Sequence, residues 1–152
     1  MLHARQPVAG EASDIAWIGE AQARRIRVGF ESVAADADGF AAEFYDTLFG
    51  IAPALRPLFR GDMAEQRVKL LRMLALLVNN LERAELLRDA LRKLGERHQG
   101  YGVVERDFHP VGQALLTTLS SRLGIDFTVE DRRAWADLYV RVVAMMQGRE
   151  QP

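Results

Sequence analysis

Apolar residues recur at intervals of three and four along most of this chain. That spacing gathers them on one face of a helix, whereas a half-buried strand needs strict alternation of apolar and polar residues. The sequence has no alternating β-branched stretch bounded by turn dipeptides. Pro53, Pro57 and Pro110 interrupt the pattern and leave room for long helices between them. The sequence therefore predicts an all-α fold.

Length and charge limit the classes of function. A chain of 152 residues corresponds to one domain, and such a domain buries roughly 70% of its unfolded surface, which suffices for a core without disulfides. The formal net charge of -1 lacks the basic excess of a nucleic-acid binder. The longest apolar run, Met73 to Val78, is far below the roughly 20 residues of a membrane span, and residues 1–10 lack a secretory signal. We therefore predict a cytoplasmic protein with no nucleic-acid or membrane partner.

Caps and breakers divide the apolar pattern into helices. Small polar residues favour turns, and a Thr or Asp just before an apolar repeat favours a helix start. No internal repeat is visible, so we expect one helical domain. The expected boundaries are, in chain order, a break at residues 36–39, a helix end at Gly50, a short helical turn over residues 53–59, a helix start at Gly61 and Asp62, a stop at Gly100 and Gly102, a helix over about residues 105–123, and a capping box of Thr128 with Asp131.

Three polar side chains interrupt the apolar stripes of three different helices: Tyr45, Gln66 and His98. Each alone has an ordinary structural explanation. A tyrosine hydroxyl or glutamine amide in a core is commonly satisfied by nearby backbone, and a histidine at a helix C-terminus is favoured by the helix dipole. Together they are costly, because each buried polar group without a partner costs roughly 1–3 kcal/mol. We therefore expect a ligand that satisfies them.

Histidine is the commonest metal ligand in proteins, but this chain contains only His3, His98 and His109. A multi-histidine metal site therefore cannot be built, and no His-x-x-x-His or Glu-x-x-His pattern accompanies His98. A site with one protein ligand needs a cofactor that fills the other coordination positions. Haem does so through its pyrrole nitrogens, and His98 is therefore our candidate iron ligand.

Several spaced motifs resemble those of bacterial globins. The resemblance is to the haem domain of flavohaemoglobins and to single-domain Vitreoscilla-type haemoglobins, and it covers about residues 24–147. It implies a globin fold, a three-over-three helical sandwich around a haem b. The motifs are Phe44-Tyr45-Asp46-Thr47-Leu48-Phe49, Pro57-Leu58-Phe59, Gln66 four residues before Leu70, His98, and Pro110-Val111-Gly112-Gln113 with Leu115 and Leu116.

The resemblance also implies a domain organisation. Residues 1–20 are expected to form a partly helical N-terminal extension. The globin domain is expected over residues 21–148, and residues 149–152 are expected to be a tail.

On the two faces of the haem, the resemblance implies four roles. His98 corresponds to the proximal histidine that binds iron. Tyr45 and Gln66 correspond to the distal tyrosine and glutamine, and Leu70 to the apolar residue over the ligand. A bound O2 carries partial negative charge, so the Tyr45 hydroxyl, held in place by Gln66, is expected to stabilise O2 far more than neutral CO. Slow O2 release should follow.

The remaining matched positions surround the haem. Phe59 resembles the phenylalanine that stacks on the porphyrin, and Leu94 lies one turn before the proximal histidine. Val103 and Phe108 fall at the proximal haem edge. Lys69 is expected on the rim as the partner of a haem propionate. As an alternative, Lys69 binds ferric iron at the sixth position, where water and the distal tyrosine are the other candidates.

The chain departs from the flavohaemoglobin pattern in two places. Phe108 stands where a tyrosine usually pairs with a glutamate to support the proximal histidine, and a phenylalanine cannot make that hydrogen bond. Glu150 falls near the expected acidic position. The stretch between Phe59 and Gln66 is also shorter than usual, so the distal helix is expected to lie differently over the haem.

Two functions remain open. The first is a haem-b globin, monomeric or homodimeric, that binds O2, NO and CO reversibly through Tyr45 and Gln66. Its role is O2 handling, or NO detoxification by NO dioxygenase activity with an external reductase, because the sequence lacks a Gly-x-Gly-x-x-Gly fingerprint. The alternative is a haem-based gas sensor that acts through a protein partner, for which residues 1–20 offer a docking segment. A haem-free interaction protein is a third reading, and His98 argues against it.

Overall fold

The computed structural model describes residues 18–148, while residues 1–17 and 149–152 lie outside its described part. All regular elements within residues 18–148 are helices, which confirms the all-α prediction. Most of the predicted N-terminal extension and the whole predicted tail, Glu150 included, lie outside the described residues. The elements are α2 (Glu20–Ala35), α3 (Ala37–Ile51), η1 (Pro53–Leu58), α4 (Met63–Asn79), α5 (Ala84–Gly100), η2 (Glu105–Asp107), α6 (Phe108–Leu123), η3 (Gly124–Asp126) and α7 (Val129–Met146).

Local capping explains where several helices begin. The Asp62 side chain accepts the Ala64 N–H at 3.0 Å at the start of α4. Thr128 and Asp131 form the predicted capping box, in which the side chain of each accepts the other's backbone N–H. At both positions the sequence signal and the helix start agree.

The predicted break at residues 36–39 is too long. Asp36 alone separates α2 from α3, because it ends one helix and caps the next. Its backbone N–H donates to the Val33 carbonyl, and its side chain accepts the Gly39 N–H at 3.3 Å. Residues 37–39 therefore form the first turn of α3.

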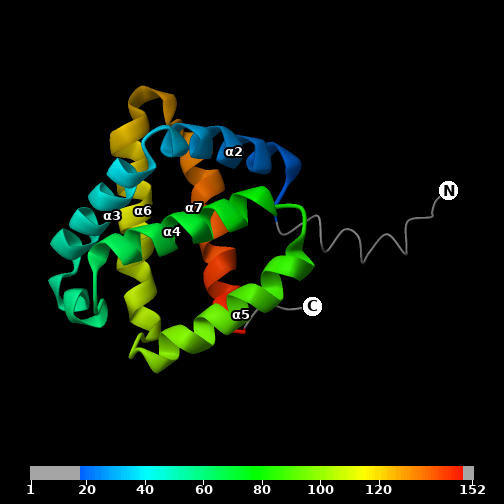
Figure 1. Ribbon diagram of the computed structural model, residues 1–152. Helices are drawn as coiled ribbons and strands as arrows, with labels where there is room; N and C mark the ends of the chain where they lie inside the picture. Colours follow the sequence, from blue (N-terminus) through cyan, green and yellow to red (C-terminus); the bar gives the residue numbers. More distant parts are fainter. Residues whose placement is uncertain (1–17, 149–152) are drawn as a thin grey trace.

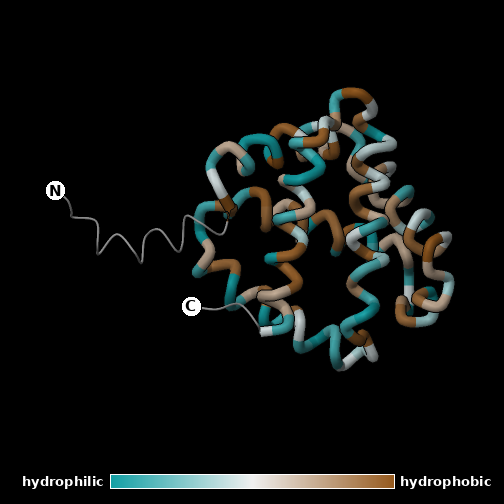
Figure 2. The backbone as a smooth tube through the Cα atoms, turned by 180° about the vertical axis from the view of Figure 1, so that it is seen from behind, coloured by the Kyte–Doolittle hydropathy of each residue, from teal (hydrophilic) through white to brown (hydrophobic). Residues whose placement is uncertain are grey.

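The helices cross one another in layers. Figure 1 shows α2, α4 and α5 in front of α6 and α7. The main packed pairs are α3 with α6, α5 with α7, and α2 with α7, while α3 also packs on α4. Figure 2 shows apolar and polar positions alternating along each helix, as amphipathic packing requires. The largest fully buried side chains include Trp135, Phe40, Ile26, Leu48, Leu81, Leu87, Leu91 and Leu119.

The helices α4 and α5 do not pack extensively against each other. Large apolar side chains from these helices and from η1 and α6 contact the core but remain only half-buried. Exposed apolar surface is unfavourable at about 25 cal/mol per Å², so further burial of this set would stabilise the protein. The set comprises Leu58, Phe59, Leu70, Met73, Leu94, Phe108 and Val111.

Within residues 18–148, no helix combines the length and the apolar character that crossing a membrane demands.

Candidate functional site

His98 lies in the last turn of α5, at the end of the apolar stripe that contains Leu87, Leu91 and Leu94. Its ring nitrogen Nδ1 lies 2.8 Å from the Leu94 carbonyl oxygen. A carbonyl oxygen only accepts hydrogen bonds, so this contact requires the proton on Nδ1. The other nitrogen, Nε2, then carries a lone pair that can bind a metal. This is the arrangement that the proximal role of His98 requires.

A cavity of about 450 Å³ adjoins His98. Val103 and Phe108 line it, and Gly95 and Met146 form the side between α5 and α7. Three of the predicted site residues, His98, Val103 and Phe108, are therefore brought together although two turns and η2 separate them in sequence. Leu94 joins this group through its carbonyl, and its side chain is half-buried.

Tyr45 on α3 forms the centre of a second group. Its side chain is buried, and its ring lies 5.5 Å from the ring of Phe59 in an edge-to-face arrangement. The rings of Phe44 and Phe49 lie 5.0 Å and 6.0 Å away. Burial raises the pKa of Tyr45 to about 12. The hydroxyl therefore keeps its proton at neutral pH and can serve as a hydrogen-bond donor.

The contact between Tyr45 and Gln66 differs from the expected one. The tyrosine hydroxyl donates to the backbone carbonyl of Gln66 at 3.3 Å, and the glutamine side chain turns away to donate to the Arg60 carbonyl at 3.4 Å. Gln66 therefore meets the Tyr45 hydroxyl through its main chain, and the distal roles of both residues stay predictions. The short connection from Phe59 to Gln66 brings the Arg60 carbonyl within reach of the amide, which satisfies it locally.

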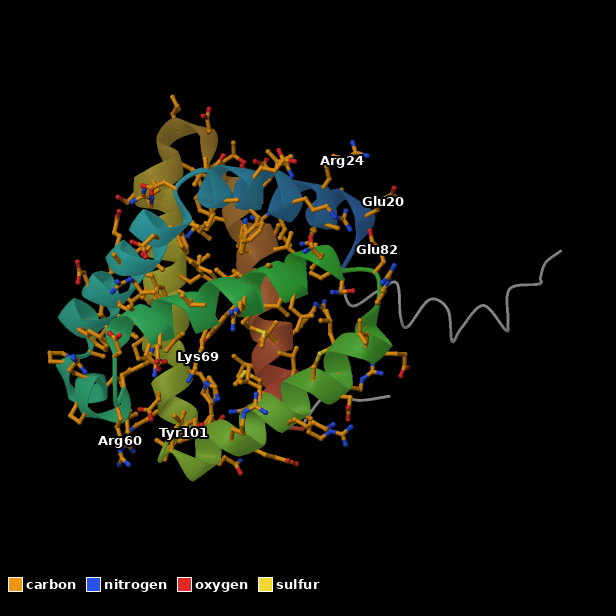
Figure 3. All side chains as sticks on the ribbon, in the orientation of Figure 1. Glu20, Arg24, Arg60, Lys69, Glu82 and Tyr101 are labelled. Carbon is orange, nitrogen blue, oxygen red and sulfur yellow. The ribbon has the colours of Figure 1, made fainter. Side chains whose placement is uncertain are left out.

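Leu70 and Lys69 lie next to each other on α4 but differ in exposure. Leu70 is half-buried, whereas Lys69 is exposed. In Figure 3, Lys69 lies on the side of α4 that faces α5, on the same part of the molecule as Arg60 and Tyr101. This placement agrees with a rim position for Lys69, and its roles toward a propionate or toward iron stay predictions.

Tyr139 on α7 contacts a residue of the site, Phe108, and the sequence did not predict this contact. Its hydroxyl donates to the Phe108 carbonyl at 2.5 Å, and its ring fills the space beside Gly112. The available signal was the place of Tyr139 on the inward stripe of α7, which does not reveal the partner of a hydroxyl. In the flavohaemoglobin pattern a tyrosine side chain at the position of Phe108 makes a hydrogen bond. Here the main-chain carbonyl of Phe108 accepts one from Tyr139 instead.

The residues present fit a metal carried in an organic ring. Within residues 18–148, no group of three His, Cys, Asp or Glu side chains could hold a bare ion. His98 offers one nitrogen, and the half-buried apolar side chains of η1, α4, α5 and α6 suit an apolar group. Haem provides both the remaining ligands and such a surface. The fold and site therefore fit the class of helical proteins in which one histidine faces a cofactor that carries its own metal ligands.

The chain belongs to the globin family. Residues 42–146 match the family model described as globin. Neuroglobin-1 of Oncorhynchus mykiss is 30% identical over 141 residues, which cover 84% of this chain and 89% of that protein. The neuroglobin of Danio rerio is 32% identical over 135 residues, covering 80% of this chain and 85% of that protein.

Solved globin structures share the fold. A bacterial globin from Campylobacter jejuni superposes with a TM-score of 0.73 at 22% identity, covering 86% of this chain and 95% of that one. The deoxy haemoglobin of Dasyatis akajei gives a TM-score of 0.74 at 19% identity, covering 88% and 99%. The predicted globin fold, a three-over-three helical sandwich, is confirmed. These relatives do not support the more particular likeness to flavohaemoglobins or Vitreoscilla-type haemoglobins.

Proposed function

We propose that this chain is a haem-b globin that binds O2 reversibly, and NO and CO at the same site. The observation that carries the proposal is the Nδ1 contact of His98 with the Leu94 carbonyl at 2.8 Å, which leaves Nε2 as the iron ligand. Membership of the globin family supports haem as the cofactor. The half-buried apolar side chains of η1, α4, α5 and α6 support a position beside them.

Bound haem supplies an iron at which these gases bind, and the surrounding residues decide which gas is held longest. Tyr45 is the donor on the distal side, because its hydroxyl is protonated at neutral pH and its ring is buried beside Phe59. Its present bond to the Gln66 carbonyl, at 3.3 Å, is long for a hydroxyl donor. Exchanging that bond for one to a partly negative oxygen is therefore favourable. The same hydrogen bond stabilises bound CO less, because CO carries little charge.

Phe49, Phe59 and Leu70 give the distal side an apolar lining. The rings of Phe49 and Phe59 lie 5.4 Å apart and both flank Tyr45. Such a lining excludes water, which hinders oxidation of ferrous iron. The proximal group of Leu94, Val103 and Phe108 has the same effect around His98.

The physiological role we propose is O2 handling or NO detoxification. In the second role NO, O2 and one electron combine to give nitrate, and an external reductase supplies the electron. The distal pair Tyr45 and Gln66 is the part of the sequence that supports a flavohaemoglobin-like or Vitreoscilla-like role. The cytoplasmic location and the monomeric or homodimeric state stay predictions.

Absorption spectra of the purified protein test the cofactor. We expect a Soret band that shifts after dithionite, after exposure to air and after addition of CO. Failure of added hemin to bind would remove the proposal.

An NO-consumption assay with a generic reductase then tests the role. Multiple turnovers would support NO detoxification. A single stoichiometric oxidation would contradict that role and favour O2 storage or the alternative, a gas sensor that acts through a protein partner.

A further inference from the structure

The first turn of α6 is held from the side by α7. The hydroxyl of Tyr139 donates to the carbonyl of Phe108 at 2.5 Å. Phe108 and Gly112 stand four residues apart, so the Phe108 carbonyl belongs to the helical turn that ends at Gly112. A side chain from another helix thus bonds a carbonyl of the first turn of α6.

The ring of Tyr139 packs so closely on Gly112 that no larger residue fits there. A Cβ atom built on Gly112 would lie 2.6 Å from Cε2 and 2.8 Å from Cδ2 of the ring, closer than real Cβ atoms approach. Only glycine admits the ring at this depth. The hydroxyl and the ring together fix the place of the Phe108 backbone relative to α7.

The contact between Tyr139 and Phe108 lies next to the cavity beside His98, because Phe108 lines that cavity. Phe108 and His98 line the same cavity, together with Val103. The imidazole has one polar anchor, the Leu94 carbonyl, and rotation about its Cβ–Cγ bond would break that contact. Around the imidazole, the ring of Tyr101 lies 6.3 Å away, and Val103 and Phe108 line the same cavity.

We propose that Tyr139 is a positioning residue for His98: by holding the first turn of α6 it keeps Phe108 against the imidazole side of the cavity and so keeps Nδ1 on the Leu94 carbonyl. The Nε2 atom then has one direction and one protonation state, which an iron ligand requires. The role toward iron rests on the proposed function, whereas the effect on the imidazole itself does not.

The test compares Tyr139→Phe with a control substitution on α6, the helix that Tyr139 holds. Tyr139→Phe removes only the hydroxyl. The control is Thr118→Val, which removes a buried hydroxyl that donates to the Ala114 carbonyl at 2.8 Å but is not among the residues that line the cavity. Phe108→Leu serves as a second variant, since it weakens the same wall directly and keeps the question open should Tyr139→Phe not fold.

Two readouts are measured. In the haem-free protein, the imidazole 15N shifts of His98 report the fraction with the proton on Nδ1, and we expect a loss of that fraction in Tyr139→Phe and in Phe108→Leu. In the ferrous haem-loaded protein, we expect the iron–histidine stretching band of the same variants to shift and broaden. Thr118→Val should leave both readouts as in the original protein.

The outcomes separate the two proposals. Unchanged 15N shifts and an unchanged stretching band in Tyr139→Phe and Phe108→Leu would overturn the positioning role. Equal changes in Thr118→Val would overturn it too, because they would show general loosening of α6. If the 15N shifts respond as expected but neither the original protein nor any variant binds haem, the positioning role stands and the proposed function fails.

Discussion

Gly95 on α5 lies directly against the backbone carbonyl of Met146 on α7. A Cβ atom built on Gly95 would lie 1.8 Å from that oxygen, and the obstacle is main chain, which cannot move aside. This contact lets α5, with His98 in its last turn, approach α7 closely.

We expect Gly95→Ala to lower the free energy of unfolding by about 1–3 kcal/mol, the usual effect of overpacking. Urea unfolding followed by circular dichroism measures it. Gly50→Ala is the control, because no atom lies within 4 Å of its built Cβ. Equal midpoints for Gly95→Ala and the original protein would show that the two helices separate without cost.

His98→Ala removes the proposed iron ligand. We expect the Soret band of the haem-loaded protein to be lost or to move to that of loosely held haem, while the helical circular dichroism is kept. His109→Ala is the control, because His109 is exposed on α6. A normal spectrum in His98→Ala would place the iron ligand elsewhere in the chain.

Tyr45→Phe removes the proposed distal donor and keeps the ring. A hydrogen bond to a charged acceptor contributes roughly 1.5–3 kcal/mol, so the O2 dissociation rate should rise about ten- to a hundredfold. Stopped-flow or flash photolysis measures this rate, and the CO dissociation rate, which should change little, is the internal control. An unchanged O2 rate would remove Tyr45 from ligand stabilisation.

Tyr45 also links stability to alkaline pH. Its pKa is about 12 in the folded chain against 10.0 for a free tyrosine, so the folded state retains the proton that the unfolded state loses. The stability from this difference is fully present below pH 10 and is lost as the pH rises toward 12. At full loss it amounts to about 2–3 kcal/mol.

Unfolding by urea at several pH values between 9 and 12 checks this link, with Tyr45→Phe measured beside the original protein. The two proteins share every other ionisable group, so the difference between their two stability curves isolates Tyr45. We expect the free energy of unfolding of the original protein to fall relative to that of Tyr45→Phe as the pH rises above about 10. A constant difference would contradict the raised pKa.

The relation between sequence and structure differs from one element to the next. The capping box of Thr128 with Asp131 and the start of α4 at Asp62 were predictable, because a cap and its target lie within three residues. The break at Asp36 was overestimated. One aspartate there both ends α2 and caps α3, which composition alone does not reveal.

The sequence by itself determined the helical class, the stripe that ends in His98 and the burial of Tyr45, since helical periodicity acts between residues three or four apart. The tertiary structure decided which groups those side chains meet. Tyr45 bonds the main chain of Gln66, and Tyr139 bonds the main chain of Phe108. Main-chain carbonyls are present at every residue, so only the packing of one helix on another selects which of them a hydroxyl reaches.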